Sequence, residues 1–381
     1  MDQLYLGRGN SEQFDEYMDF INYVFGFNGN ENDFKKLLPK LYREDLNPAG
    51  NSYIAMENGK MKAAIGAFPG EVEVCGMKLR HVGIGNVAVH PYSRSKGYMK
   101  KLLHMAVDDM VKEGIDFSAL GGHRQRYNYF SYEKAGLKYI FGVDSKNIRH
   151  VFGDKKPPFQ VEEVTKEDKA ALDVIEKISS SKSYNSFRKK EELYNILCNW
   201  QHKPYIFKDG ENIIGYCIVG GESVTEILTI KNEDFLGAAW SLVAMKHSVS
   251  FAIPEFQSSY IDDLDTIANG GSVQHSAMFT VLCYKRVIEA FLCLKAEYTQ
   301  LPDGEFTVLI HGRGGDETLL IAVKDGNITV EETDAMPEME LEHLEAMRFF
   351  FALVCEKRRK MPHYIQCWFP LPLWEYSADA V

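Results

Sequence analysis

The chain has 381 residues, of which 45% are hydrophobic and 25% charged, the proportions of a globular protein. This length exceeds one ordinary domain and predicts two or three. The 43 basic and 54 acidic residues leave a net charge of −11. That balance argues against general nucleic-acid binding, which requires basic side chains that neutralise phosphates.

No apolar run approaches the roughly 18 residues of a membrane span, so we expect no membrane partner. The N-terminus lacks a basic segment followed by an apolar core, so no secretory signal is expected. The seven cysteines never form a C-x-x-C pair. They indicate reduced thiols of a cytoplasmic protein rather than disulfides or a metal site.

The first segment, residues 1–150, begins with signals of paired strands. Alternating apolar residues over Asn51–Val74 are interrupted by Asn58-Gly59, the dipeptide most typical of a tight hairpin. A second hairpin is predicted at Cys75-Gly76, and it leads into a strand over Arg80–Val89.

The most informative stretch follows, Asn86–Leu103, with the sequence NVAVHPYSRSKGYMKKLL. An alternating strand enters a short loop with Arg94, Lys96 and Gly97, and an amphipathic helix that ends at Gly114 begins directly after it. Backbone N–H groups, the positive end of a helix dipole and two cationic side chains then point at one place. This pattern predicts a site for a diphosphate.

The rest of the first segment completes an alternation of strands and helices. We predict a strand over Ile115–Leu120, a short helix over Tyr127–Ala135 capped by Gly136, and a closing strand over Leu137–Val143. The run Lys155–Pro158 is typical of a boundary between domains.

The second segment, residues 151–274, repeats the order of the first. The predicted elements are helices over Lys166–Ser179 and Arg188–Asn199, strands over Tyr205–Lys208, Ile213–Val219 and Val224–Ile230, a helix over Phe235–Lys246 and a strand over Val249–Ile253. The junction Lys231–Asp234 has no glycine and carries two carboxylates where a phosphate would lie. This copy is therefore predicted to be degenerate and to bind no nucleotide.

The third segment, residues 275–381, predicts a helix, a three-stranded meander and a second helix. The expected ranges are Thr280–Leu294, Phe306–His311, Leu319–Val323, Ile328–Glu331 and Glu338–Glu356. Helices and strands in separate runs indicate an α+β domain. The cationic run Lys357–Lys360 is interpreted as a favourable helix C-terminus rather than a membrane or RNA patch.

The element order and loop of the first segment resemble the GCN5-related N-acetyltransferase (GNAT) family. The family pattern R-x-x-G-x-G/A is matched by Arg94–Met99 except at Met99, where the chain has a bulkier residue. The resemblance implies acetyl-coenzyme A as cofactor and coenzyme A as product. It implies that the strand offers backbone groups to the pantetheine arm and that the loop wraps the pyrophosphate. These residues are Val87, Ala88 and Val89 in the strand, and Arg94, Ser95, Lys96, Gly97, Tyr98 and Met99 in the loop.

The same resemblance suggests Tyr132 as a general acid, because the family often has a tyrosine in this region that protonates the leaving thiolate. The alternative is a packing tyrosine whose hydroxyl bonds the backbone. The general base stays open. Candidates are His123 and Glu133, followed by His81, His90 and His104.

The full layout resembles the Eis (enhanced intracellular survival) acetyltransferases. The expected fold class is α/β, with tandem GNAT-like mixed-sheet domains followed by a smaller α+β domain similar to a sterol carrier protein. In that family the C-terminal carboxylate can enter the cleft as a base, which would assign the role to Val381. An ordinary frayed terminus is the alternative. A homo-oligomer is also implied.

The expected function is acetyl-coenzyme A-dependent transfer of an acetyl group to a primary amine of a small cationic or peptide acceptor, by direct attack. Two other classes stay open. One is a non-catalytic acyl-coenzyme A sensor. The other is a lipid-binding protein that uses the C-terminal domain, where Phe349–Phe351 could line a tunnel or simply form the core.

Overall fold

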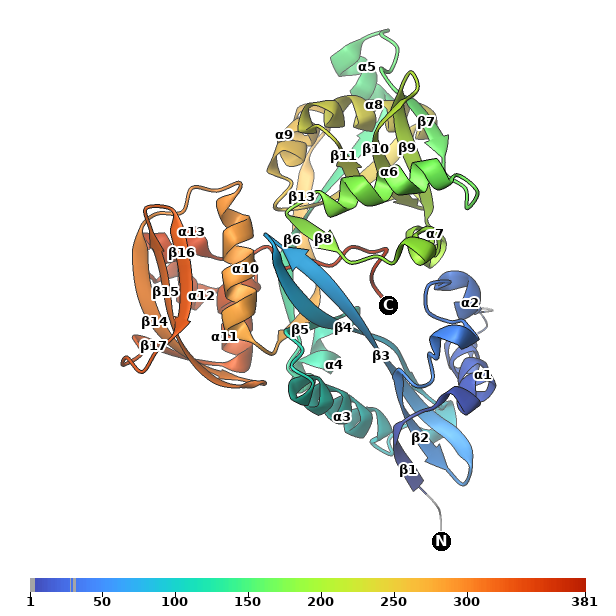
Figure 1. Ribbon diagram of the computed structural model, residues 1–381, viewed down its shortest axis with the longest axis vertical. Helices are drawn as coiled ribbons and strands as arrows, with labels where there is room; N and C mark the ends of the chain where they lie inside the picture. Colours follow the sequence, from blue (N-terminus) through green and yellow to red (C-terminus); the bar gives the residue numbers. More distant parts are fainter. Residues whose placement is uncertain (1–3, 28, 30–31) are drawn as a thin grey trace.

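The computed structural model describes residues 4–27, 29 and 32–381. No secretory signal is expected at the N-terminus, and Met1–Gln3 of that stretch lie outside the described residues. Two sheets organise this part of the chain, one of thirteen strands and one of four. Helices cover both, and the C-terminus lies near the centre of the molecule in Figure 1. The expected mixed α/β class is confirmed. No helix of the described residues is long and apolar enough to cross a membrane.

The large sheet runs without a break through both of the first two predicted domains. Its strands in spatial order are β1 (Leu4–Arg8), β2 (Ser52–Glu57), β3 (Lys60–Val74), β4 (Met77–Val89), β5 (Phe117–Leu120), β13 (Gly271–Val281), β6 (Glu133–Asp144), β12 (Ser248–Pro254), β11 (Ser223–Thr229), β10 (Asn212–Gly220), β9 (Lys203–Asp209) and β7 (Gln160–Glu163), with β8 (Tyr184–Ser186) paired to β3.

Both predicted hairpins of the first segment are confirmed. Asn58 and Gly59 have positive φ angles of 53° and 72° between β2 and β3, as do Cys75 and Gly76, at 49° and 79°, between β3 and β4. Two consecutive residues with positive φ give a turn whose twist matches that of the flanking strands. The dipeptides therefore fixed the pairing of the strands that carry the predicted site.

The helices of the first segment lie against this sheet. They are α1 (Phe14–Gly26), α2 (Phe34–Leu37), α3 (Tyr98–Lys112), α4 (Arg124–Tyr127) and α5 (Ser145–Phe152). Helix α3 buries its apolar stripe against β2, β3 and β4, and it ends before Gly114, which has a φ of 67°. The predicted helix after the phosphate loop is confirmed.

The short helix predicted over Tyr127–Ala135 is wrong. The helical residues are Arg124–Tyr127 and a 3-10 turn at Asn128–Phe130, and strand β6 already begins at Glu133. Ser131, at a φ of 72°, breaks the helix, and the ladder with β13 includes Glu133–Ala135. The closing strand is thus longer than its apolar pattern suggested, because it pairs on both sides.

The second repeat contains α6 (Lys169–Ser180), α7 (Leu193–Leu197), α8 (Phe235–Lys246) and α9 (Ser258–Ile267). Its predicted strands and its helix before β12 are confirmed, whereas the helix predicted over Arg188–Asn199 is confined to α7 and flanking 3-10 turns. Strand β13 follows this repeat in the sequence but lies between β5 and β6 of the first. The predicted boundaries at residues 150 and 274 fall inside α5 and β13.

The third unit packs helices against the small sheet. Its elements are α10 (Tyr284–Ala296), β14 (Gly304–Gly312), β15 (Gly315–Lys324), β16 (Asn327–Glu332), β17 (Met339–Glu342), α11 (His343–Phe351), α12 (Glu356–Arg359) and α13 (His363–Trp368). The three meander strands are confirmed. Both predicted helices start too early, because Met278–Val281 pairs with β5 and Met339–Glu342 pairs with β14. Phe349–Phe351 are fully buried in the core of this unit.

A C-terminal segment, residues 369–381, leaves α13 and runs back to the first domain, as the red trace that ends at the C mark in Figure 1 shows. It has no regular secondary structure, yet most of it is buried. The segment therefore connects the third unit to the strands that carry the predicted site.

Candidate functional site

The loop between β4 and α3 has a backbone shaped by two residues with positive φ. Ser95 and Gly97 have φ angles of 70° and 76°, and Gly97 is the N-cap residue of α3. A Cβ atom added at Gly97 would meet nothing within 4 Å, so the space in front of the helix start is open. The first N–H groups of α3 have no partner inside the helix and carry the positive end of its dipole.

A cavity of about 660 Å³ opens at this loop, and we call it the loop cavity. It contains most of the residues that the family pattern identified, and its lining residues are Val24, Val87, Val89, Ser93, Arg94, Ser95, Gly97, Tyr98, Met99, Lys100, Arg126 and Phe130. Ala88 and Lys96 are the two predicted residues that do not line it. Ala88 packs on the opposite face of the sheet, in the core formed with α1.

The charges around the loop cavity suit an anion. Arg94 and Lys100 come from the loop and from the first turn of α3, and Arg126 comes from α4. Lys96 instead pairs with Glu57 at 2.8 Å, and this carboxylate also accepts a hydrogen bond from the Tyr98 hydroxyl at 3.0 Å. Both contacts lower the pKa of Glu57, with the Lys96 contact the larger cause. The residues present therefore fit a pyrophosphate beside a helix start.

At Asn86, the side chains of β4 reverse the order in which they alternate between the two faces of the sheet. This residue has a φ of 48°, and its side-chain amide donates to the Tyr42 hydroxyl. Before Asn86 the even residues Val82 and Ile84 face α3, whereas after it Val87 and Val89 do. A single residue out of the strand conformation inverts the alternation. The bulge therefore turns Val87 and Val89 toward the loop cavity.

The sheet opens beyond this point. The parallel pairing of β4 with β5 ends at Ile84 and Leu120, and in the described chain no strand pairs with that edge of β4 from Gly85 to Val89. Its N–H and C=O groups are available to an extended ligand. The opening is thus suited to an amide-bearing arm that lies along the strand.

A second cavity, of about 800 Å³, lies at the other side of this opening, and we call it the central cavity. Most of its lining comes from the end of β5, from β6 and β13, and from the C-terminal segment. These residues include Leu120, Gly121, Gly122, Lys134, Lys138, Gln274, His275, Glu375 and Val381, and the second repeat adds Trp200, Thr225 and Ala252. Val381 lies directly against β4. A Cβ atom at Gly83 would be 2.7 Å from its Cγ2, and one at Gly85 would be 3.0 Å from its carboxyl carbon. A side chain at Gly83 or Gly85 would crowd this contact.

Hydrogen bonds hold the C-terminal segment in place. Lys40 Nζ donates to the carbonyl of Ala378 at 2.8 Å, and the Asn199 amide donates to the carbonyls of Ala378 and Ala380. The buried Arg188 forms ion pairs with both Asp379 and Glu226. Residues near Val381 are thus anchored by contacts that leave them little freedom to fray.

Tyr132 is fully buried, and its hydroxyl lies 2.7 Å from Ser118 Oγ. Ser118 in turn donates to the carbonyl of Val82, which lies two residues before the point where the pairing of β4 with β5 ends. Burial raises the pKa of Tyr132 well above its ordinary value. Neither the loop cavity nor the central cavity includes Tyr132 in its lining.

Tyr127 is not among the site residues predicted from the sequence. It is the last residue of α4 and lies in the sequence between Gly122, which lines the central cavity, and Phe130, which lines the loop cavity; like Tyr132, it is not itself among the lining residues of either cavity. A Cβ atom at Gly122 would meet its ring at 2.3 Å, so the phenol crosses Gly122 closely. Burial raises its pKa as well. Its position a few residues after the end of β5, where the pairing between β5 and β4 ends, is the signal that could have identified it.

The base candidates differ in what surrounds them. Glu133 is bound by the guanidinium groups of Arg124 and Arg348, which bring its pKa to about 2 against the opposing effect of burial. A carboxylate held in this way is a weak base. His81 is buried with its Nδ1 unpartnered among the described residues, and burial lowers its pKa to about 4. His104 packs against Phe130, and His90 caps the turn before the loop.

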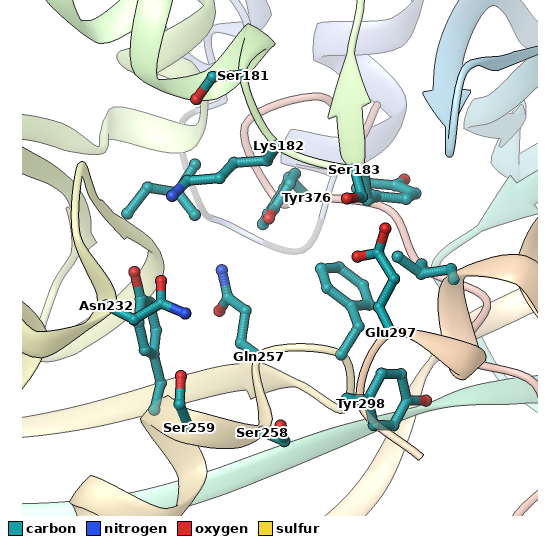
Figure 2. Close-up of a pocket in the computed structure, with 15 residues that line it drawn as sticks. Ser181, Lys182, Ser183, Asn232, Gln257, Ser258, Ser259, Glu297, Tyr298 and Tyr376 are labelled. Carbon is teal, nitrogen blue, oxygen red and sulfur yellow. The ribbon is translucent and has the colours of Figure 1, made fainter. Parts of the chain in front are cut away.

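A third cavity, of about 360 Å³, lies beside the second repeat and contains none of the predicted residues. Figure 2 shows Lys182, Gln257, Glu297 and Tyr376 around it. Tyr376 belongs to the C-terminal segment, and its buried hydroxyl has no partner among the described residues. This cavity therefore contacts the opposite side of the segment that ends at the central cavity.

The junction predicted to be degenerate differs from the loop as expected. Residues 232–234 form a 3-10 turn before α8, and Glu233 pairs with Lys231 at 3.6 Å in an exposed position. No residue of this turn has positive φ. The second repeat thus has a strand and a helix in the same order without a loop of this conformation.

Comparison with known proteins agrees with this arrangement. Residues 7–140 match the family described as "Acetyltransferase (GNAT) domain". No curated protein matches the sequence significantly. Among solved structures, a GCN5-related N-acetyltransferase from Anabaena variabilis ATCC 29413 has a TM-score of 0.70 and 13% identity, with 100% of both chains covered.

Two further structures are similar over the same share of both chains. A GCN5-related N-acetyltransferase from Kribbella flavida has a TM-score of 0.69 and 16% identity over 100% of this chain and 99% of the other. Eis1 from Mycobacterium abscessus has a TM-score of 0.62 and 12% identity over 100% of this chain and 99% of the other. At these identities the likeness concerns the fold. Residues 7–140 therefore form a GNAT acetyltransferase domain, and the chain is an acyltransferase enzyme that contains it.

Proposed function

We propose that the protein is an acetyl-coenzyme A-dependent N-acetyltransferase that acts on a primary amine by direct attack. The observation that carries the proposal is the continuity of the site. The loop with the helix start follows β4, the edge of β4 is unpaired just before it, and Val381 of the central cavity lies against Gly83 and Gly85 of the same strand. A donor held at the loop would have its acyl end directed toward an acceptor in the central cavity.

Each part of the chain has a role in this proposal. Acetyl-coenzyme A supplies an activated acetyl group when it is bound. Arg94, Lys100 and the N–H groups at the start of α3 hold its pyrophosphate, and the free edge of β4 from Gly85 to Val89 binds the pantetheine arm. Backbone N–H groups on this edge also stabilise negative charge that develops on the carbonyl oxygen.

The proton donor to the leaving thiolate is assigned to one of two tyrosines. Tyr132 is the candidate from the sequence, but its hydroxyl is engaged with Ser118 at 2.7 Å. The ring of Tyr127 packs against Gly122, a lining residue of the central cavity, so we prefer Tyr127 as the donor. General acids contribute roughly 10²–10⁴-fold to rate. We expect Tyr127→Phe to lower kcat at least ~10-fold and Tyr132→Phe to act chiefly on stability. The reverse result would return the role to Tyr132.

The proton acceptor is assigned to the carboxylate of Val381. Its carboxyl carbon lies beside Gly85 at the sheet opening, and this placement favours the role over that of a frayed terminus. A carboxylate there can take the proton that the amine loses as the new amide bond forms. An amidated C-terminus, produced by ligation of the last residues, would remove the charge and keep the shape. We expect this variant to lose at least ~10-fold in kcat.

The test of the function is thiol release from acetyl-coenzyme A with a panel of primary amines, and mass spectrometry of the product. Amine-dependent thiol release with an acetylated amine supports the proposal. Binding of acetyl-coenzyme A without turnover for any amine would favour the acyl-coenzyme A sensor. The lipid-carrier alternative has less support, because the side chains of Phe349–Phe351 are fully buried in the core of the third unit.

A further inference from the structure

The central cavity carries charges of both signs on different walls. Lys134 and Lys138 come from β6, whereas Glu375 and the end of the chain come from the C-terminal segment. The segment crosses β6 between the two lysines, because a Cβ atom at Gly136 would lie 1.8 Å from the carbonyl oxygen of Leu373. Cationic and acidic side chains therefore line one cavity.

Lys138 is the most informative of these groups. It is only partly exposed, and no acidic side chain of the described residues pairs with it. Burial alone lowers its pKa, with no compensating carboxylate. A half-buried cation without a counter-charge is costly, so it favours a ligand that supplies one.

The acidic residues near the lysines cannot serve as that counter-charge. Glu133 is adjacent in sequence to Lys134, but its two oxygens are bound by Arg124 and Arg348. Glu375 belongs to the opposite wall, where its Oε1 is buried, has no hydrogen-bond partner among the described residues and lies 3.9 Å from His81 Nδ1. Burial raises the pKa of Glu375. The central cavity therefore has a lysine without a counter-charge on one wall and a carboxyl oxygen without a hydrogen-bond partner on the other.

From the proposed function and this charge pattern, we infer that the acceptor is an amino carboxylate, such as an amino acid or a peptide with a free C-terminus, and that Lys138 binds its carboxylate. The amine then lies toward Glu375 and Val381, on the side of the sheet opening. A polyamine would place additional positive charge against Lys134 and Lys138. An amine without an anionic group would leave Lys138 unpaired.

The experiment compares matched acceptors that differ only in the carboxylate. Lysine with cadaverine, tryptophan with tryptamine, and glycylphenylalanine with its amide form three such pairs. We expect kcat/KM to be at least ~10-fold higher for the carboxylate member of an accepted pair. In Lys138→Met the two members should differ by less than about 3-fold, whereas Lys138→Arg should keep the preference. Lys169→Met, on the exposed face of α6, is the control and should match the wild type.

The outcomes separate this inference from the proposed function. Turnover that favours cadaverine or spermidine, or a carboxylate preference that survives in Lys138→Met, would overturn the inference and leave the acetyltransferase intact. Thiol release with no amine of any class, while acetyl-coenzyme A binds, would overturn the function and the inference with it.

Discussion

Replacement of Arg188 by Met tests what holds the C-terminal segment against the site. The guanidinium donates to Glu226 at 2.9 and 2.7 Å and to Asp379 at 2.9 and 2.8 Å. The side chains of Arg188 and Glu226 are 4% and 1% exposed, and that of Asp379 is 12% exposed. Met fills a similar volume but leaves two buried carboxylates without their cation. Loss of one partner from a buried ion pair costs about 3–5 kcal/mol.

Such a loss should be visible in thermal denaturation. At roughly 2–4 °C per kcal/mol for a domain of 150–250 residues, the melting temperature should fall by at least about 6 °C. Lys190→Met is the control, because it removes an exposed ion pair with Asp173 and should leave the melting temperature unchanged. Differential scanning fluorimetry measures both. Equal melting temperatures for Arg188→Met and the wild type would refute the view that this network anchors the segment.

The same variant has a functional consequence. Asp379 lies two residues before Val381, so release of the segment should move the carboxylate away from the sheet opening. Misplacement of about 1 Å can cost ~10²-fold in rate. We expect kcat for acetyl transfer to fall at least ~10-fold in Arg188→Met at a temperature where the protein is still folded. An unchanged kcat would contradict the proposed role of the chain end.

Two further predictions concern the tail contact and acid stability. Gly85→Ala should lower kcat roughly 10-fold, because its Cβ would lie 3.0 Å from the carboxyl carbon of Val381. Gly142→Ala, in open space on β6, is the control and should leave kcat unchanged. Equal kcat values for the two variants would count against the contact. Burial lowers the pKa of His343 to about 4, so below pH 6.5 the unfolded chain binds a proton that the folded chain does not. Stability should therefore be complete above pH 6.5 and fall by about 3 kcal/mol toward pH 4 from this residue. His343→Gln should lose less over that range in melts at each pH, and an equal loss would exclude His343 as a source.

The sequence contained enough to predict the local geometry of the donor site. The turn dipeptides at Asn58-Gly59 and Cys75-Gly76 act through their own backbone preferences, and the loop before α3 depends on residues that are adjacent in the chain. Seven of the nine residues predicted for the cofactor line the loop cavity. Lys96 differs because Glu57, a residue of β2, competes for its charge.

Features that depend on distant partners could not be read in this way. Strand β13 lies between β5 and β6 although about 130 residues of sequence separate it from β6, so its pairing has no local signal. The helix predicted over Tyr127–Ala135 failed for that reason, since Glu133–Ala135 pairs with β13. The position of Val381 depends on Gly83 and Gly85, whose role is only to leave space.

One acetyl-coenzyme A is expected to bind at the loop between β4 and α3. Isothermal titration calorimetry of acetyl-coenzyme A into the wild type, Gly97→Glu and Gly210→Glu measures this binding. Both glycines have positive φ and open space in front of them, but Gly210 lies in the turn between β9 and β10. We predict one site per chain, a Kd at least ~10-fold weaker in Gly97→Glu, and no change in Gly210→Glu. No binding by the wild type, or equal affinity in Gly97→Glu, would show that this loop does not hold acetyl-coenzyme A.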